Sequence, residues 1–348
     1  MASWVGSNFS VVSRGLGQGG WCWQVVPVTL LVVLLPVSGS EVQTLTEHVR
    51  DPAFNDITFF LQMPPGIEET EPDRFGRDSV EVRGVLALCT WTADLESVRA
   101  NLNPNGRFKH LLSWAAENHL AVVTWTNFRG YTIRESGDEM EEERREEFDE
   151  AFDDRVGEWE RGFRRLCRKF DLPESNVLIY GLSGGGQLAH RLVLRAPEHF
   201  FAIHIHVNSS YDLPRRGGED LLWMVTTGTL EAGYPAAKRF YRQALDLGYH
   251  MIFKAEENLG HSDSAANRRL SLAFFDFCLT FLPDAADPEW EAPPENWEYF
   301  MRYPVYLGDW YNQLVFPTEA GEKQIPPEFL VSLPTRGIAE AWGLIVED

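Results

Sequence analysis

The chain has 348 residues, of which 44% are hydrophobic and 24% are charged, so it is neither disordered nor collagen-like. A chain of this length can bury a large apolar core without disulfides or a structural metal. Its formal net charge of −21 argues against a nucleic-acid-binding protein, because phosphate recognition needs clustered Lys and Arg, and it disfavours a stable partner in an anionic membrane.

The N-terminal part contains an apolar segment, residues 25–37, that has no charged side chain and is followed by Ser38, Gly39 and Ser40. This run is too short to cross a membrane as a helix, which takes about 20 residues. An apolar run followed by small residues is typical of a cleaved secretory signal peptide. We therefore predict a signal peptide over residues 1–40 and a secreted or periplasmic protein, with a retained membrane anchor as the alternative.

Strands and helices alternate from about residue 55 to residue 283. Apolar runs predict strands at 57–63, 82–91, 121–125, 177–180, 200–207, 221–227 and 250–254. Helical spacing of apolar residues, or a position between two strands, predicts helices at 108–120, 135–170, 184–195, 235–247 and 265–282. Continuous apolar strands indicate a sheet that is covered on both faces and is mostly parallel. The order predicts a three-layer α/β domain over 41–283, with helices on both faces of a central sheet.

Residues 284–348 differ in composition, because they are rich in proline and aromatic residues. They are too aromatic for a disordered linker. We predict a C-terminal aromatic extension that packs its rings on the main domain. A position bordering the substrate cleft is the alternative.

Cysteine and histidine residues give little evidence for a metal or a cofactor. Cys89, Cys167 and Cys278 are widely spaced and are interpreted as buried thiols that act as small apolar side chains. His204 and His206 are two apart on a predicted strand, so they point to one face and could form half of a metal site. With no third ligand evident nearby, we interpret them as hydrogen-bonded or pocket-lining residues, and we predict no metal and no cofactor.

The segment 176–186 reads NVLIYGLSGGG, an apolar strand followed by Gly-Leu-Ser-Gly-Gly and then a helix. A G-x-S-x-G sequence between a strand and a helix indicates a nucleophile elbow, in which a tight turn presents the serine hydroxyl at the helix N-terminus. There, backbone N–H groups and the helix dipole favour a developing oxyanion. A phosphate-binding loop is the rival interpretation, but the Lys and Ser/Thr that follow its last glycine are absent.

On these residues the chain resembles the α/β-hydrolase superfamily, particularly secreted serine esterases of the polyester-depolymerase and feruloyl-esterase kind and dienelactone-hydrolase-like enzymes. The resemblance covers about residues 80–283 and rests on three motifs in the family's order. The elbow is followed by Gly228-Thr229-Leu230-Glu231, where the family typically has Asp as the fourth residue, and then by Asn258-Leu259-Gly260-His261-Ser262.

The resemblance implies a catalytic triad of Ser183, His261 and Glu231. It also implies that the backbone N–H of Gly184 is one oxyanion donor, and that the second comes from residues 90–92, which we assign to Trp91. Asp212 and Asp263 are rivals to Glu231, and Asp212 is the alternative acid because it follows the strand after the elbow helix.

The activity implied is hydrolysis of carboxylic esters, small or polymer-linked, through an acyl-enzyme intermediate. One alternative is a prolyl-oligopeptidase-like serine peptidase, although the large propeller domain of that family has no room here. The other is a non-catalytic binding protein with the α/β-hydrolase fold, against which the presence of all three triad residues argues.

Overall fold

The computed structural model of the chain describes residues 44–51, 54–64, 82–90, 95–126, 142–283 and 290–346. The predicted signal peptide, residues 1–40, lies outside the described residues. No helix within the described part of the chain combines the length and the apolar character needed to cross a bilayer.

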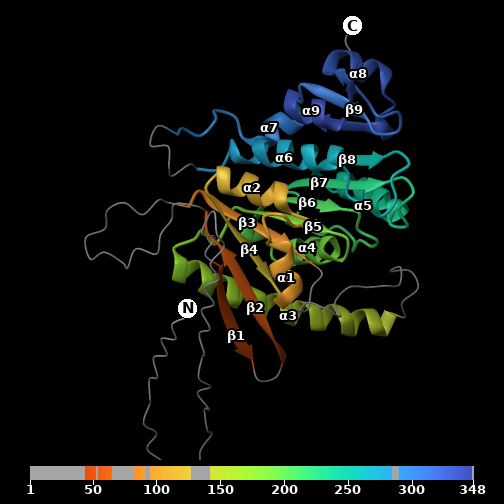
Figure 1. The fold of residues 1–348 in the computed structure, drawn as a ribbon. Coiled ribbons are helices and arrows are strands. Elements are labelled where there is room, and N and C mark those ends of the chain that lie inside the picture. Colours follow the sequence, from red (N-terminus) through yellow and green to blue (C-terminus); the bar gives the residue numbers. More distant parts are fainter. Residues whose placement is uncertain are drawn as a thin grey trace, which may run out of the picture.

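Within the described residues, eight strands form the central sheet, in the order β1-β2-β4-β3-β5-β6-β7-β8 (Figure 1). β1 pairs antiparallel with β2, and β2 antiparallel with β4, whereas β3 to β8 pair in parallel. All residues of β3, β4, β5 and β7 are buried, which explains why these strands are mostly apolar. The prediction of a mostly parallel sheet is confirmed. The strands are β1 (Thr44–Asp51), β2 (Phe54–Gln62), β3 (Gly84–Cys89), β4 (Leu120–Trp125), β5 (Val177–Leu182), β6 (Phe200–His206), β7 (Leu222–Gly228) and β8 (His250–Glu256).

Helices cover both faces of this sheet (Figure 1). His204 of β6 contacts Phe274 of α6, with ring centroids 6.5 Å apart. The next residue, Ile205, lies directly under Gly186 of α4. Because successive side chains of a strand point to opposite faces, α6 and α4 belong to different layers. These helices are α1 (Leu95–Asn101), α2 (Lys109–Glu117), α3 (Glu142–Phe170), α4 (Gly184–Arg195), α5 (Tyr234–Asp246) and α6 (Ala265–Leu279).

Within each layer the helices contact one another through paired side chains. Trp114 of α2 donates its indole N–H to Asp276 of α6 at 2.7 Å. In the other layer, Arg195 of α4 pairs with Asp149 of α3 at 2.8 Å. The long α3 matches the predicted apolar stripe, since Trp159 on it is fully buried. The predicted three-layer architecture is therefore present.

The C-terminal residues form a second, four-stranded sheet of order β11-β9-β10-β12 rather than only wrapping the first. It lies beside α6 and β8 (Figure 1). Trp342 of the adjoining helix α9 (Arg336–Trp342) is fully buried and donates its indole N–H to the Phe253 carbonyl of β8 at 3.0 Å. Other aromatic residues of this part, such as Tyr303 and Tyr311, are exposed. The elements are α7 (Trp297–Arg302), β9 (Tyr306–Asp309), β10 (Leu314–Pro317), α8 (Thr318–Gln324), β11 (Leu330–Leu333), α9 (Arg336–Trp342) and β12 (Leu344–Ile345).

Candidate active site

Ser183 occupies a strained turn between β5 and α4. Its φ of 56° and ψ of −127° lie outside the regions that non-glycine residues normally adopt. The glycines on either side make this turn possible. A Cβ on Gly181 would lie 2.6 Å from the Gly185 carbonyl oxygen, and one on Gly185 would lie 2.1 Å from the Cys89 carbonyl oxygen. The geometry is that of a nucleophile elbow, with the serine at the N-terminus of the following helix.

Three of the predicted residues meet at this turn through hydrogen bonds. Ser183 Oγ lies 2.8 Å from His261 Nε2. His261 Nδ1 in turn lies 3.0 Å from Glu231 Oε2. The Glu231 side chain is only 4% exposed, whereas that of His261 is 51% exposed. The acid is thus buried behind a histidine that a ligand can reach, and the hydroxyl, imidazole and carboxylate form one continuous chain.

Backbone contacts hold the loop after β7, which carries Glu231, against the loop after β8, which carries His261 and is called the histidine loop. β7 ends at Gly228, where a Cβ would lie only 2.0 Å from the Leu259 carbonyl oxygen, so glycine is needed for this close approach. The Leu230 N–H donates to the same oxygen at 3.0 Å. Because Glu231 and His261 each follow within two residues of these contacts, the loops deliver both side chains to the same place.

The alternative acid, Asp212, is bonded to arginines of α4 and not to His261. It accepts hydrogen bonds from Arg191 at 2.7 Å and from Arg195 at 3.1 Å. Burial alone would raise the pKa of Asp212, but the surrounding basic side chains, Arg191 first among them, together outweigh burial and hold that pKa below its ordinary value. The structure therefore brings Glu231 to the histidine, and it engages Asp212 in an ion-pair network on α4.

Asp263, the other rival, also has partners of its own. It accepts from Arg268 at 2.7 Å and from the Asn267 side chain at 3.1 Å. These bonds tie the start of α6 to the end of the histidine loop. Asp263 thus supports the segment that carries His261, and it is Glu231 that contacts the imidazole.

Of the predicted oxyanion donors, Gly184 is placed and Trp91 is not. Gly184 is the first residue of α4, where backbone N–H groups have no partner within the helix. Trp91 lies outside the described residues. The chain just before it is described, and Thr90 Cα would lie 3.1 Å from a Cβ on Gly185. Thr90, which directly follows β3, therefore lies beside the elbow.

The ring nitrogens of His204 and His206 all have hydrogen-bond partners. Both histidines contact Thr226 Oγ1, each at 2.8 Å. The second nitrogen of His204 lies 3.0 Å from Ser271 Oγ, and that of His206 lies 3.1 Å from the Ser262 carbonyl oxygen. This agrees with their interpretation as hydrogen-bonded residues. What the sequence pattern missed is that His206 reaches the loop carrying His261.

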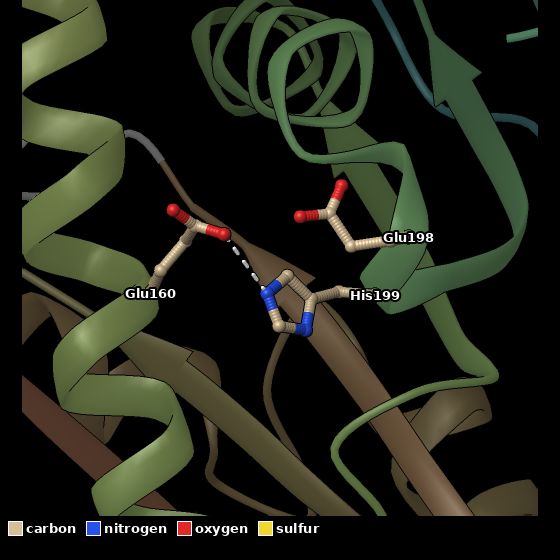
Figure 2. Close-up of side chains that lie close together, drawn as sticks. All are labelled: Glu160, Glu198 and His199. Carbon is tan, nitrogen blue, oxygen red and sulfur yellow. Dashed lines mark hydrogen bonds and ion pairs between the residues drawn. The ribbon is translucent and has the colours of Figure 1, made fainter. Parts of the chain in front are cut away.

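A second group of titratable side chains lies apart from this chain of residues. Figure 2 shows Glu160 of α3 beside Glu198 and His199, which follow α4. Each residue has one carboxylate oxygen or ring nitrogen that could bind a metal ion, and these three atoms lie within 4.8 Å of one another. His199 Nε2 lies 3.1 Å from Glu160 Oε1, and Nδ1 lies 2.7 Å from the Glu174 carbonyl oxygen. Since both ring nitrogens have oxygen partners within the protein, we interpret the group as a contact that ties residues 197–199 to α3.

The three cysteines within the described residues, Cys89, Cys167 and Cys278, are free and buried, as predicted from the sequence. Burial raises the pKa of the Cys89 thiol strongly and that of Cys167 to about 12. Because the thiolate is the nucleophilic form, neither is suited to attack a substrate. Ser183 remains the candidate nucleophile.

Comparisons with known proteins give matches to solved structures alone. No protein-family profile matches the chain, and no curated protein does. A putative dipeptidyl aminopeptidase IV from Bacteroides ovatus ATCC 8483 is similar with a TM-score of 0.48 and 12% identity, over 70% of this chain and 36% of that one. A thermostable esterase matches with a TM-score of 0.42 and 16% identity, over 62% of this chain and 55% of that one. An S-formylglutathione hydrolase from Staphylococcus aureus matches with a TM-score of 0.45 and 11% identity, over 69% of this chain and 100% of that one.

The chain thus spans 36% and 55% of the first two of these proteins. At such low identities their activities do not transfer to this chain. The fold follows from the chain's own topology, in which a mostly parallel sheet carries a nucleophile elbow after β5. This is the α/β-hydrolase fold, as predicted.

Proposed function

We propose that the chain is a serine hydrolase that cleaves carboxylic esters through an acyl-enzyme intermediate. The observation that carries this proposal is the hydrogen-bonded chain from Ser183 Oγ to His261 Nε2, at 2.8 Å, and from His261 Nδ1 to Glu231, at 3.0 Å, which starts at a strained turn. A serine is a weak nucleophile unless an adjacent base takes its proton and a third group orients that base. These three residues meet that requirement.

In the acylation step, Ser183 Oγ attacks the ester carbonyl carbon while its proton moves to His261 Nε2. The carbonyl oxygen becomes an oxyanion, which the Gly184 N–H stabilises at the positive end of the α4 dipole. His261 then returns the proton to the alcohol oxygen as the carbon–oxygen bond breaks. Glu231 accepts the Nδ1–H bond, fixes the tautomer and stabilises the imidazolium.

Deacylation repeats these steps with water as the nucleophile. His261 takes a proton from water, the hydroxide oxygen attacks the acyl carbon, and the proton returns to Ser183 Oγ as the acid leaves. A second oxyanion donor is proposed at residues 90–92, because Thr90, the last of this segment that the structure describes, lies beside Gly185 of the elbow. Export from the cell stays a prediction from residues 1–40.

A fluorophosphonate probe tests the proposal directly, because it reacts only with an activated serine. We expect wild-type protein to be labelled at Ser183 and to hydrolyse a chromogenic ester. Ser183→Ala should abolish labelling and lower turnover by at least about 10³-fold. Its thermal unfolding should change little, since the substitution removes one oxygen at a partly exposed turn.

The substrate class is tested with matched ester and amide substrates that share one acyl group. Preference for the ester supports the proposal. Comparable kcat/KM on a peptide amide favours the peptidase alternative. Absence of both labelling and turnover favours a binding protein with this fold.

A further inference from the structure

A buried chain of polar side chains lies beneath the proposed catalytic residues and is not used by the mechanism above. It runs from Ser271 of α6 through His204, Thr226 and His206 to the carbonyl oxygen of Ser262. Both histidines are almost completely buried, at 0% and 1% exposure. A buried polar group lowers stability unless it is hydrogen-bonded, so a buried chain of this length calls for a physical explanation.

His206 touches both the nucleophile turn and the histidine loop. Its main-chain oxygen accepts from the Ser183 N–H at 2.9 Å. Its imidazole Nε2 lies 3.1 Å from the oxygen of Ser262, the residue next to His261. One residue therefore bonds to the nucleophile itself and to the immediate neighbour of the proposed base.

The hydrogen positions on His206 follow from its partners. A carbonyl oxygen only accepts, so Nε2 carries the hydrogen that faces Ser262, with Asp263 Oδ1 3.8 Å away on the same side. Burial lowers the pKa of His206 to about 4, which keeps the ring neutral near pH 7. Nδ1 then has no hydrogen and accepts from the Thr226 hydroxyl. The threonine thus fixes the tautomer that donates to the loop.

The backbone after His206 is also strained. Val207 has a φ of 43° and is fully buried. A positive φ is a clear outlier for a β-branched residue, and it persists only where the surroundings enforce it. The Val207 N–H donates to the Thr226 carbonyl at 2.9 Å, so the sheet itself holds this turn in place under the elbow.

We infer that His206 is a positioning residue that fixes the distance between Ser183 Oγ and His261 Nε2, holding the first through its main-chain oxygen and the second through its imidazole. The inference rests on the proposed serine-hydrolase function. It predicts that loss of the Nε2 donor lets the loop carrying His261 move, while the elbow stays in place.

The test compares two amide side chains of different length at this position. The amide nitrogen of Gln reaches near the position of Nε2 and can donate to Ser262, whereas Asn reaches only as far as Nδ1. Turnover is normalised to active sites titrated with the fluorophosphonate probe, so that misfolded protein is not counted. We expect His206→Asn to lower kcat per titrated site by about 10- to 100-fold with KM within about twofold, in line with the cost of small misplacements. His206→Gln should stay within about fivefold of wild type.

His204→Asn is the matched control, because His204 lies on the same strand and face, is equally buried and bonds to the same threonine. It should lower the melting temperature comparably and leave kcat per titrated site within about twofold of wild type. Equal losses in His204→Asn and His206→Asn would show general loosening of the core and overturn the inference. So would a His206→Asn enzyme with wild-type kcat.

If His206→Asn does not fold, Thr226→Val decides the matter, since it removes the hydroxyl that fixes the tautomer. Because the same hydroxyl also contacts His204, Thr226→Val is compared with His204→Asn. A fall in kcat per titrated site of at least about threefold in Thr226→Val, with His204→Asn unchanged, supports the inference, and an unchanged kcat in Thr226→Val or an equal fall in both overturns it. Failure of the proposed function is distinguishable, because wild-type protein would then neither be labelled nor turn over an ester.

Discussion

At the level of single residues, Glu231 and Asp212 follow neighbouring strands, and their surroundings give them different roles. Glu231 is buried and contacts His261 at 3.0 Å. Asp212 contacts two guanidinium groups, of which that of Arg191 is almost fully buried. Glutamate is one methylene longer than the usual aspartate, and the tight turn at Gly228 places its backbone so that the carboxylate still meets the imidazole.

Of the variants Glu231→Gln and Asp212→Asn, Glu231→Gln should therefore cause the larger loss of activity. The amide keeps the shape of the side chain but does not support the productive histidine tautomer, so kcat/KM on an activated ester should fall by up to about 10⁴-fold. Labelling by fluorophosphonate should slow in parallel. The measurement is steady-state kinetics together with a thermal melt, which should change little.

Asp212→Asn is the comparison variant, and it should lower stability more than it lowers activity. Asp212→Asn removes the carboxylate charge that Arg191 and Arg195 share, and breaking a buried ion pair costs at most about 3–5 kcal/mol of unfolding free energy. Turnover per folded molecule should stay within about tenfold of wild type. If Asp212→Asn abolishes turnover in folded protein while Glu231→Gln is nearly silent, the acid has been assigned to the wrong strand.

At the level of elements, the start of α4 lies in direct contact with the end of β3. Gly185 is the contact point, because a Cβ there would lie 2.1 Å from the Cys89 carbonyl oxygen. Both are backbone groups within packed elements, so neither can move without moving its element. The position of Gly184, the first proposed oxyanion donor, relative to β3 is therefore set by helix–strand packing.

Gly185→Ala tests this coupling. The methyl group must push α4 away from β3, so we expect lower stability and a kcat loss of at least about 10²-fold, because both proposed oxyanion donors shift. The measurements are a thermal melt and kcat per titrated site.

Gly157→Ala on α3 is the control, since a Cβ there would meet one arginine nitrogen at 3.5 Å, an ordinary contact. It should raise stability by about 0.5–1 kcal/mol, because alanine favours a helix over glycine, and leave turnover unchanged. A Gly185→Ala protein as stable and active as wild type would show that the two elements are not coupled.

Much of the element order was predictable because the elements are long and strongly patterned. The apolar stripe of α3 and the mostly apolar runs of β3, β4, β5 and β7 each identify one element type. The C-terminal sheet was not predicted. Its strands have two or four residues, too few for a period to show, and they form only because they pair with one another.

The meeting of Ser183, Glu231 and His261 was also predictable, because each follows the end of a parallel strand and these ends share one edge of the sheet. Their catalytic roles stay proposals. The contacts of His206 were not predictable, since its partners come from β7 and from the loop after β8. A hydrogen-bonded chain across several elements leaves no spacing signal in the sequence.

At the level of the whole molecule, the C-terminal sheet and the α/β domain share a buried boundary. Trp297 packs against Phe201 and His250, with ring centroids 6.3 and 5.0 Å apart. The ammonium group of Lys254 on β8 donates to the Trp342 carbonyl, and this lysine is almost completely buried. β8 is the last strand of the central sheet, so the C-terminal sheet covers side chains near its edge.

Deleting residues 284–348 should therefore leave a protein that aggregates. The truncation exposes aromatic surface on α6 and β8 and removes the acceptor of the Lys254 ammonium, and an exposed apolar patch of this kind promotes association. Size-exclusion chromatography and a thermal melt measure the effect. Tyr303→Ala in the full chain is the control, because this side chain is 61% exposed and its removal should change neither readout. A soluble, monomeric truncation with the wild-type melting temperature and wild-type ester turnover would show that the C-terminal sheet is an independent appendage and that the boundary contacts contribute no stability.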